Sequence, residues 1–231
     1  MLQGILPYLI LQYIVDNELK VQGDDEPVKL PAMDKLADKL GISMGKLREE
    51  LIAARTYGVV EMRPGDGTYV QPFDFYAAIR ALVLYSAAYD WRYFEQLYTM
   101  RVQMERAFWD EAVRRLTEED MTALRQTLEQ ATHRLKDMPV EIPHKEHREL
   151  HLLIYRRLEN QFAQGLFKAY WDAYEAVGLH RYFDYSYYER MWTSHHEMVE
   201  AIEAGQYDRG KEVLTSHFTL LEDRLQGSPG A

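Results

Sequence analysis

Residues 29–71 read KLPAMDKLADKLGISMGKLREELIAARTYGVVEMRPGDGTYVQ, and the spacing of their apolar side chains decides the fold of this part of the chain. Two sets recur at the spacing of one helix face: Leu36, Ala37 and Leu40, then Leu47, Leu51 and Ala54. Only residues 41–43 separate the two sets. The pattern therefore predicts two short amphipathic helices that meet across a tight turn, which is a helix-turn-helix.

A two-stranded wing is predicted directly after the second helix. Gly58 closes that helix, and residues 59–62 and 68–70 are typical of two short strands. The loop between them has glycines at positions 65 and 67, where a tight connection needs positive φ. The whole stretch is predicted to be a winged helix-turn-helix.

Such a unit places the start of its second helix in a DNA major groove, which is about 12 Å wide. The residues expected to face bases, phosphates or the sugar-phosphate backbone are Ser43, Met44, Gly45, Lys46 and Arg48 on the helix, with Gly65, Gly67 and Thr68 on the wing. Winged helices also serve as protein-binding modules. A module for protein interaction or dimerisation is therefore the alternative prediction.

The same stretch resembles the DNA-binding domain of GntR-type bacterial transcription regulators. The matching segments occur in order and without gaps: Leu30-Pro31, Lys35-Leu36-Ala37, Leu40-Gly41-Ile42-Ser43, Leu47-Arg48-Glu49, Gly58-Val59-Val60 and Arg63-Pro64-Gly65-x-Gly67-Thr68. The resemblance implies binding to a double-stranded DNA operator.

Three positions depart from the family pattern in the acidic or neutral direction, namely Asp34, Met44 and Asp66. Residues 1–70 hold 8 Lys and Arg against 11 Asp and Glu, a net charge of −3. DNA affinity comes largely from cationic contacts to phosphate. We therefore expect weaker or unusual operator recognition.

The composition of the 231 residues, with a net charge of −10, is typical of a soluble protein, and the absence of cysteine fits the cytoplasmic location that we expect. Residues 1–14 are apolar, but they lack a basic start and a cleavage site and are too short to span a bilayer. They predict an amphipathic helix that buries Ile5, Ile10, Tyr13 and Ile14. Residues 21–28 are then predicted to be a solvated loop.

Long helices are predicted beyond Pro72, with no further strand. Seven segments have apolar spacing near 3.6: residues 73–88, 91–116, 117–138, 143–158, 160–177, 185–204 and 206–225. Thr117 to Asp120 gives the third a capping-box start. The predicted architecture is mainly α, with a winged helix at 1–72 and a seven-helix bundle at 73–231.

Several short motifs occur through this second domain: Met100-Arg101 with Glu105, Leu158-Glu159-Asn160, residues 178–183, and His195-x-x-Met198-Val199-x-Ala201-Ile202-x-x-Gly205 followed by His217. With these motifs the domain resembles the FCD ligand-binding domain of the FadR subfamily. The resemblance implies a homodimeric regulator that responds to a small molecule. A carboxylate effector is one expectation, and a fatty-acyl effector, suggested by Arg181-Tyr182-Phe183, is the other.

Four histidines are candidate metal ligands. His147 and His151 are four apart on one predicted helix, so both side chains project from the same face. His195 and His217 are brought level by the hairpin around Gly205. Many FCD domains hold a divalent metal with Asp-x-x-x-His and two later histidines, and here His147 takes the place of the aspartate. An all-imidazole set favours zinc or nickel, with occupancy expected to fall as the pH drops through about 6.5.

Arg101 is predicted to hold an effector carboxylate, because a guanidinium offers two parallel donors to a planar anion. The alternative is an ion pair with Glu105. Tyr170 and Tyr174 are candidate effector-binding residues, although bundle packing also accounts for tyrosines here. The sequence has no phosphate loop, nucleophile elbow or cysteine nucleophile, so no enzymatic activity is expected.

Overall fold

The computed structural model describes residues 5–21, 26–178 and 184–225, with the side chains of 221–225 left out. The chain forms two compact units, Met1–Ala81 and Leu82–Ala231. The boundary between them falls within one helix, nine residues beyond the boundary that the sequence predicted at residue 72.

The first unit is a winged helix-turn-helix, as predicted. Its helices are α1 (Leu9–Asp16), α2 (Met33–Leu40) and α3 (Met44–Thr56), and its strands are β1 (Val28–Lys29), β2 (Val60–Arg63) and β3 (Gly67–Val70). Gly41 ends α2 with φ 65°, a backbone conformation that is unfavourable for residues with a Cβ. The Ser43 hydroxyl then caps α3 by accepting from the Lys46 amide at 3.2 Å. Local sequence thus fixes the turn between the helices.

The strands pair antiparallel in the order β1-β3-β2. Strand β1 was not predicted, because Val28 lies in the stretch assigned to a solvated loop and Lys29 directly follows that stretch. Ile10, Leu36, Leu47 and Leu51 form the core with Val60 and Val70. The buried Glu50 carboxylate accepts from the Ile10 amide at 3.0 Å and so joins α3 to the start of α1.

The predicted buried face of the first helix was partly wrong. Ile10 and Ile14 are buried, and Tyr13 is half-buried, but Ile5 is 68% exposed. Helix α1 begins at Leu9, and Pro7 disfavours helical backbone at Leu6, so Ile5 lies outside the helix. The apolar start of the chain therefore does not extend the helical face.

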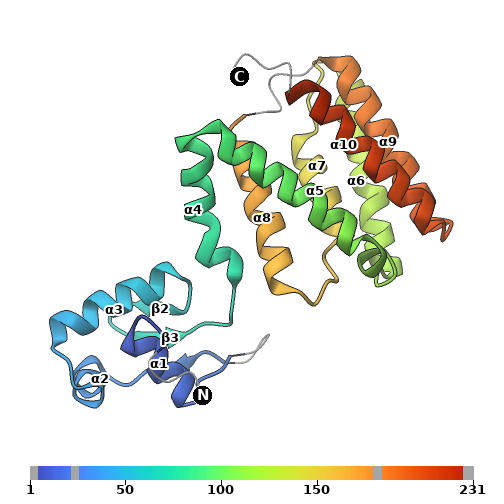
Figure 1. Cartoon of the computed structure of the whole chain (residues 1–231). Coiled ribbons are helices and arrows are strands. Elements are labelled where there is room, and N and C mark those ends of the chain that lie inside the picture. Colours follow the sequence, from blue (N-terminus) through green and yellow to red (C-terminus); the bar gives the residue numbers. More distant parts are fainter. Residues whose placement is uncertain (1–4, 22–25, 179–183, 226–231) are drawn as a thin grey trace. The chain divides into compact units, whose positions relative to one another are not determined.

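The second unit is the predicted bundle (Figure 1). Its helices are the second half of α4 (Phe75–Tyr89), which begins in the first unit, then α5 (Trp91–Val113), α6 (Glu118–Lys136), α7 (His144–Ile154), α8 (Gln161–Ala176), α9 (Tyr185–Glu203) and α10 (Tyr207–Leu225). Helices α9 and α10 form an antiparallel hairpin, side by side, that turns at Gly205.

Helix α5 is fixed against α10 by close packing and two hydrogen bonds. A Cβ on Gly210 would lie 2.7 Å from the Trp109 ring, so the contact requires glycine. The Trp109 indole donates to the Tyr207 carbonyl at 2.9 Å, and the Tyr98 hydroxyl donates to the Phe218 carbonyl at 3.0 Å. These contacts set the position of His217 relative to the polar residues of α5.

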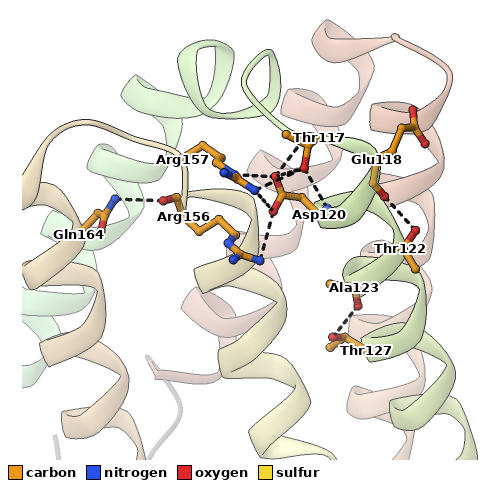
Figure 2. Close-up of polar contacts among 9 residues, drawn as sticks. All are labelled: Thr117, Glu118, Asp120, Thr122, Ala123, Thr127, Arg156, Arg157 and Gln164. Atoms are coloured by element: carbon orange, nitrogen blue, oxygen red, sulfur yellow. Dashed lines mark hydrogen bonds and ion pairs between the residues drawn. The ribbon is translucent and has the colours of Figure 1, made fainter. Parts of the chain in front are cut away.

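A buried carboxylate joins the start of α6 to the turn that follows α7 (Figure 2). Asp120 completes the predicted capping box with Thr117, and it also accepts from Arg157 Nε at 2.8 Å and pairs with Arg156 at 3.2 Å. Burial acts to raise the pKa of Asp120, but the hydrogen bonds from Arg157 and Thr117 outweigh it and lower the pKa to about 2.

Within the described segments, none of the helices has both the length and the apolar character needed to cross a membrane.

Candidate metal and effector site

The four predicted histidines meet inside the bundle. His147 and His151 come from α7, His195 from α9 and His217 from α10, and all four are buried. One ligand nitrogen from each lies within 4.8 Å of the others. The His195 and His217 ring centroids are 4.4 Å apart, and those of His147 and His151 are 5.1 Å apart. The i, i+4 spacing on α7 and the α9–α10 hairpin therefore bring the four rings together, as predicted.

The spacing and protonation of these nitrogens fit a metal ion. The His151 and His195 Nε2 atoms are 3.4 Å apart, close to the roughly 3.3 Å expected between two nitrogens on a tetrahedral zinc. Burial lowers the pKa of all four imidazoles well below the ordinary value, and neighbouring charge adds to the effect. The rings are neutral near pH 7, which is the form that binds metal.

Unpaired polar atoms are concentrated around these rings. The buried atoms without a hydrogen-bond partner among the described residues include His147 Nε2, His195 Nδ1, His217 Nδ1, Tyr170 Oη, Trp171 Nε1 and Trp192 Nε1. The Trp171 ring lies 4.7 Å from that of His147, and the Trp192 ring lies 4.8 Å from that of His195. Such atoms are costly to bury and are characteristic of a site for an ion or polar ligand.

Arg101 borders the histidines and is almost fully buried. Its Nε donates to Glu105 Oε1 at 2.6 Å, so the structure has the ion pair that the sequence offered as the alternative. Its guanidinium also lies 4.8 Å from the Tyr170 ring centroid and 4.7 Å from that of Trp171. Burial opposes the charge on Arg101, but Glu105 outweighs it and raises the pKa of Arg101 above its ordinary value.

Both predicted tyrosines are buried, Tyr170 against Arg101 and Tyr174 near His147. Burial raises the pKa of Tyr170 to about 12 and that of Tyr174 well above its usual range. Their hydroxyls therefore stay protonated and can donate to an anion. The Tyr174 ring centroid lies 6.0 Å from that of His147. The fatty-acyl expectation rests on residues 181–183, which lie outside the described part of the chain.

Sequence reasoning missed three contributors to the site. Trp171 and Trp192 were not singled out, and Glu105 was considered only as a partner of Arg101. Glu105 also lies 2.9 Å from His151 Nδ1, a contact between α5 and α7. Burial raises the pKa of Glu105, and Arg101 acts in the opposite direction. The adjacency of Trp171 to Tyr170 was the only sequence signal that could have indicated its place.

In the first unit, the predicted DNA-facing helix residues begin α3. Ser43 is the cap, Met44 is 37% exposed, and Lys46 and Arg48 are exposed. Gly65 has open space where a Cβ would lie, whereas a Cβ on Gly67 would lie 2.7 Å from the Lys29 side chain.

Thr68 is placed differently from the other predicted DNA-facing residues. Its side chain is buried, and its carbonyl accepts from the Leu30 amide at 2.8 Å. It faces inward because side chains alternate along β3 and those at 68 and 70 both point to the core.

Internal carboxylates engage the cations of the wing. Lys29 pairs with Asp66 at 2.9 Å, and the Tyr69 hydroxyl donates to the same carboxylate at 2.8 Å. Arg63 pairs with Glu61 at 2.7 Å. Asp66, one of the departures from the family pattern, thus pairs with a basic group that could otherwise contact phosphate, and Glu61 engages Arg63 in the same way.

Comparisons with known proteins agree with both units. The FCD domain family matches residues 96–220. The HTH-type transcriptional regulator LutR of Bacillus subtilis (strain 168) is 25% identical over 221 residues, covering 93% of this chain and 96% of LutR.

Two solved structures share the fold. The Streptococcus agalactiae GntR structure aligns with a TM-score of 0.64 and 17% identity, covering 93% of this chain and 96% of that one. The E. coli McbR/YncC structure aligns with a TM-score of 0.51 and 18% identity, covering 96% and 99%. The relatives and the fold are those of regulators and not of enzymes. The chain belongs to the GntR family of transcriptional regulators and carries an FCD domain.

Proposed function

We propose that this regulator binds operator DNA as a homodimer and responds to a small carboxylate held beside a metal ion in the FCD domain. The observation that carries the effector and metal proposal is the gathering of four buried neutral imidazoles with unpaired nitrogen and oxygen atoms. We also propose that the protein belongs to the FadR subfamily and acts on DNA in the cytoplasm.

His147, His151, His195 and His217 would hold the ion, with zinc or nickel favoured by the imidazole donors. A bound dication would supply a Lewis-acidic centre whose charge four neutral ligands leave in place. Arg101 would orient the other end of an anion, and the Tyr170 hydroxyl and the two indole N–H groups are donors for its oxygen atoms. This polar lining favours a hydroxy acid, sugar acid or amino acid over an acyl chain.

Metal analysis of the purified protein, together with a native mass spectrum, tests the effector site. We expect one divalent ion per chain and a small carboxylate carried through purification. Protein that takes up neither zinc nor nickel when these are supplied would contradict the metal part of the proposal.

DNA binding should depend on the start of α3. Arg48→Ala is expected to weaken specific binding by about 1 to 3 kcal/mol, the range for loss of one base-reading arginine. Fluorescence anisotropy with DNA flanking the protein's own gene measures this. The affinity should fall only gently with added salt, because Lys29 and Arg63 already pair with carboxylates.

Arg55→Ala is the matched control, since it removes the same charge from the exposed last turn of the same helix. It should leave specific binding nearly unchanged. If wild-type protein shows no saturable binding even at low salt, the winged helix is a protein-interaction module instead.

The protein should sediment as a dimer of the 27.3 kDa chain at micromolar concentration. Linking two winged helices raises the effective concentration of the second one on a palindromic operator. Leu82, Tyr85 and Tyr89 are 63% to 70% exposed on one side of α4, so they offer an apolar surface for a second copy. Leu82→Glu with Tyr85→Glu should yield monomers, and a purely monomeric wild type would refute the proposal.

A further inference from the structure

His151 Nδ1 has two competing neighbours. Glu105 Oε2 lies 2.9 Å away, and Arg101 Nη2 also lies 2.9 Å away. The nitrogen of a neutral imidazole either carries a hydrogen and donates, or carries a lone pair and accepts. An ionised carboxylate only accepts and a guanidinium only donates. The two contacts therefore require opposite tautomers of His151.

The choice of tautomer decides what the other ring nitrogen can do. When Nδ1–H donates to Glu105, Nε2 carries the lone pair, and this atom lies 3.4 Å from His195 Nε2 among the candidate ligands. When Nδ1 accepts from Arg101, Nε2 carries the hydrogen and has no lone pair for a metal. Only the first arrangement is competent for coordination through Nε2.

From this geometry we propose that Glu105 is a positioning residue that selects the metal-binding tautomer of His151, and that Arg101 opposes it. The inference rests on the proposed metal site. It gives Arg101 a second role, because an anion that attracts its Nη2 group removes the competitor for Nδ1. Effector and metal should then strengthen each other's binding by the same factor.

Glu105 is built for this role. Its side chain is 1% exposed and uses both oxygens, Oε1 for Arg101 Nε and Oε2 for His151. Its backbone carbonyl accepts from the Tyr155 hydroxyl at 2.9 Å, which ties α5 to the end of α7. The carboxylate also restores next to the ligands the negative charge that is missing from a set of four neutral imidazoles.

Glu105→Gln tests the proposal, because an amide can donate to Nδ1 as well as accept from it. Zn²⁺ affinity, measured by competition with a chromogenic chelator, should fall about 10- to 100-fold, as for loss of other partners that orient a ligating histidine. In metal-free protein, long-range ¹H–¹⁵N spectra should show His151 moving from the Nδ1–H towards the Nε2–H tautomer. The His151 signal is the one absent from His151→Ala.

Arg101→Gln is expected to have the opposite effect. It tests the same proposal if Glu105→Gln does not fold. It should bind Zn²⁺ more tightly and hold His151 in the Nδ1–H form. Asp120→Asn is the matched control, since it alters a buried carboxylate paired with arginine elsewhere in the bundle. It should leave the His151 spectrum and Zn²⁺ affinity unchanged.

Two failures are distinguishable. Wild type that binds no Zn²⁺ overturns the proposed metal site, whatever the tautomer. Unchanged His151 spectra and Zn²⁺ affinity in Glu105→Gln overturn the role of Glu105 while leaving the metal site in place.

Discussion

Replacing His195 or His217 with alanine should abolish metal retention. Each is one of four buried imidazoles that form the candidate metal site. Its loss removes one of the four ligands. We expect affinity for Zn²⁺ to fall by more than about 100-fold, which exceeds the usual effect of losing an outer partner. Elemental analysis after dialysis measures the retained metal.

His196→Ala is the control for both variants. His196 neighbours His195 in sequence, but it projects about 100° away around the helix. Its Nε2 lies 3.1 Å from Thr132 Oγ1 and not with the four candidate ligands. It should retain metal like the wild type, and equal loss from all three variants would show that the histidines act only through stability.

The structure changes the expected pH dependence of metal binding. The sequence predicted that occupancy falls through about pH 6.5, the ordinary histidine value. Burial lowers the pKa of each imidazole well below that value, so the folded rings stay neutral as the pH falls below 6.5. These four imidazoles bind protons there in the unfolded chain and not in the folded chain, so metal-free protein should lose stability below about pH 6.5.

The features that the sequence predicted correctly are local or repeat at short spacing. The turn at Gly41, the helices of the bundle and the capping box of Thr117 and Asp120 all follow from neighbours within one or two turns. The histidine cluster was also predictable, because one i, i+4 pair and one hairpin turn fix which faces the rings share.

The features that were missed depend on contacts between distant segments. Strand β1 has two residues and exists because β3 offers it a free edge. The approach of Glu105 to His151 joins residues 46 apart in the sequence, and the tryptophans beside the histidines owe their place to helix packing. A pattern within one helix does not contain such information.

Asp120→Ala should lower the free energy of unfolding by about 2 to 3 kcal/mol at pH 7. The substitution removes the side-chain half of a capping box and a fully buried carboxylate that accepts from Thr117 and Arg157 (Figure 2). The arginines lose a partner but are 38% and 43% exposed, so water compensates them in part. Urea unfolding followed by circular dichroism measures the change.

Thr122→Ala is the control on the same helix. Its hydroxyl donates to the Glu118 carbonyl, and the residue is exposed, so its loss should change stability by less than about 0.5 kcal/mol. Equal stability of Asp120→Ala and Thr122→Ala would mean that the buried network does not hold α6 to α7.

The contribution of Asp120 should also have a definite pH range. Its folded pKa, about 2, lies below the ordinary value of 3.8, so ionisation favours the folded state. The stabilisation is fully present above about pH 5 and is lost as the pH falls towards 2, where folded Asp120 also binds a proton. The difference in unfolding free energy between wild type and Asp120→Asn isolates this effect from the histidines, which titrate in both proteins. That difference should be constant from pH 7 down to about pH 5 and then shrink, and a difference that grows on acidification would contradict the assignment.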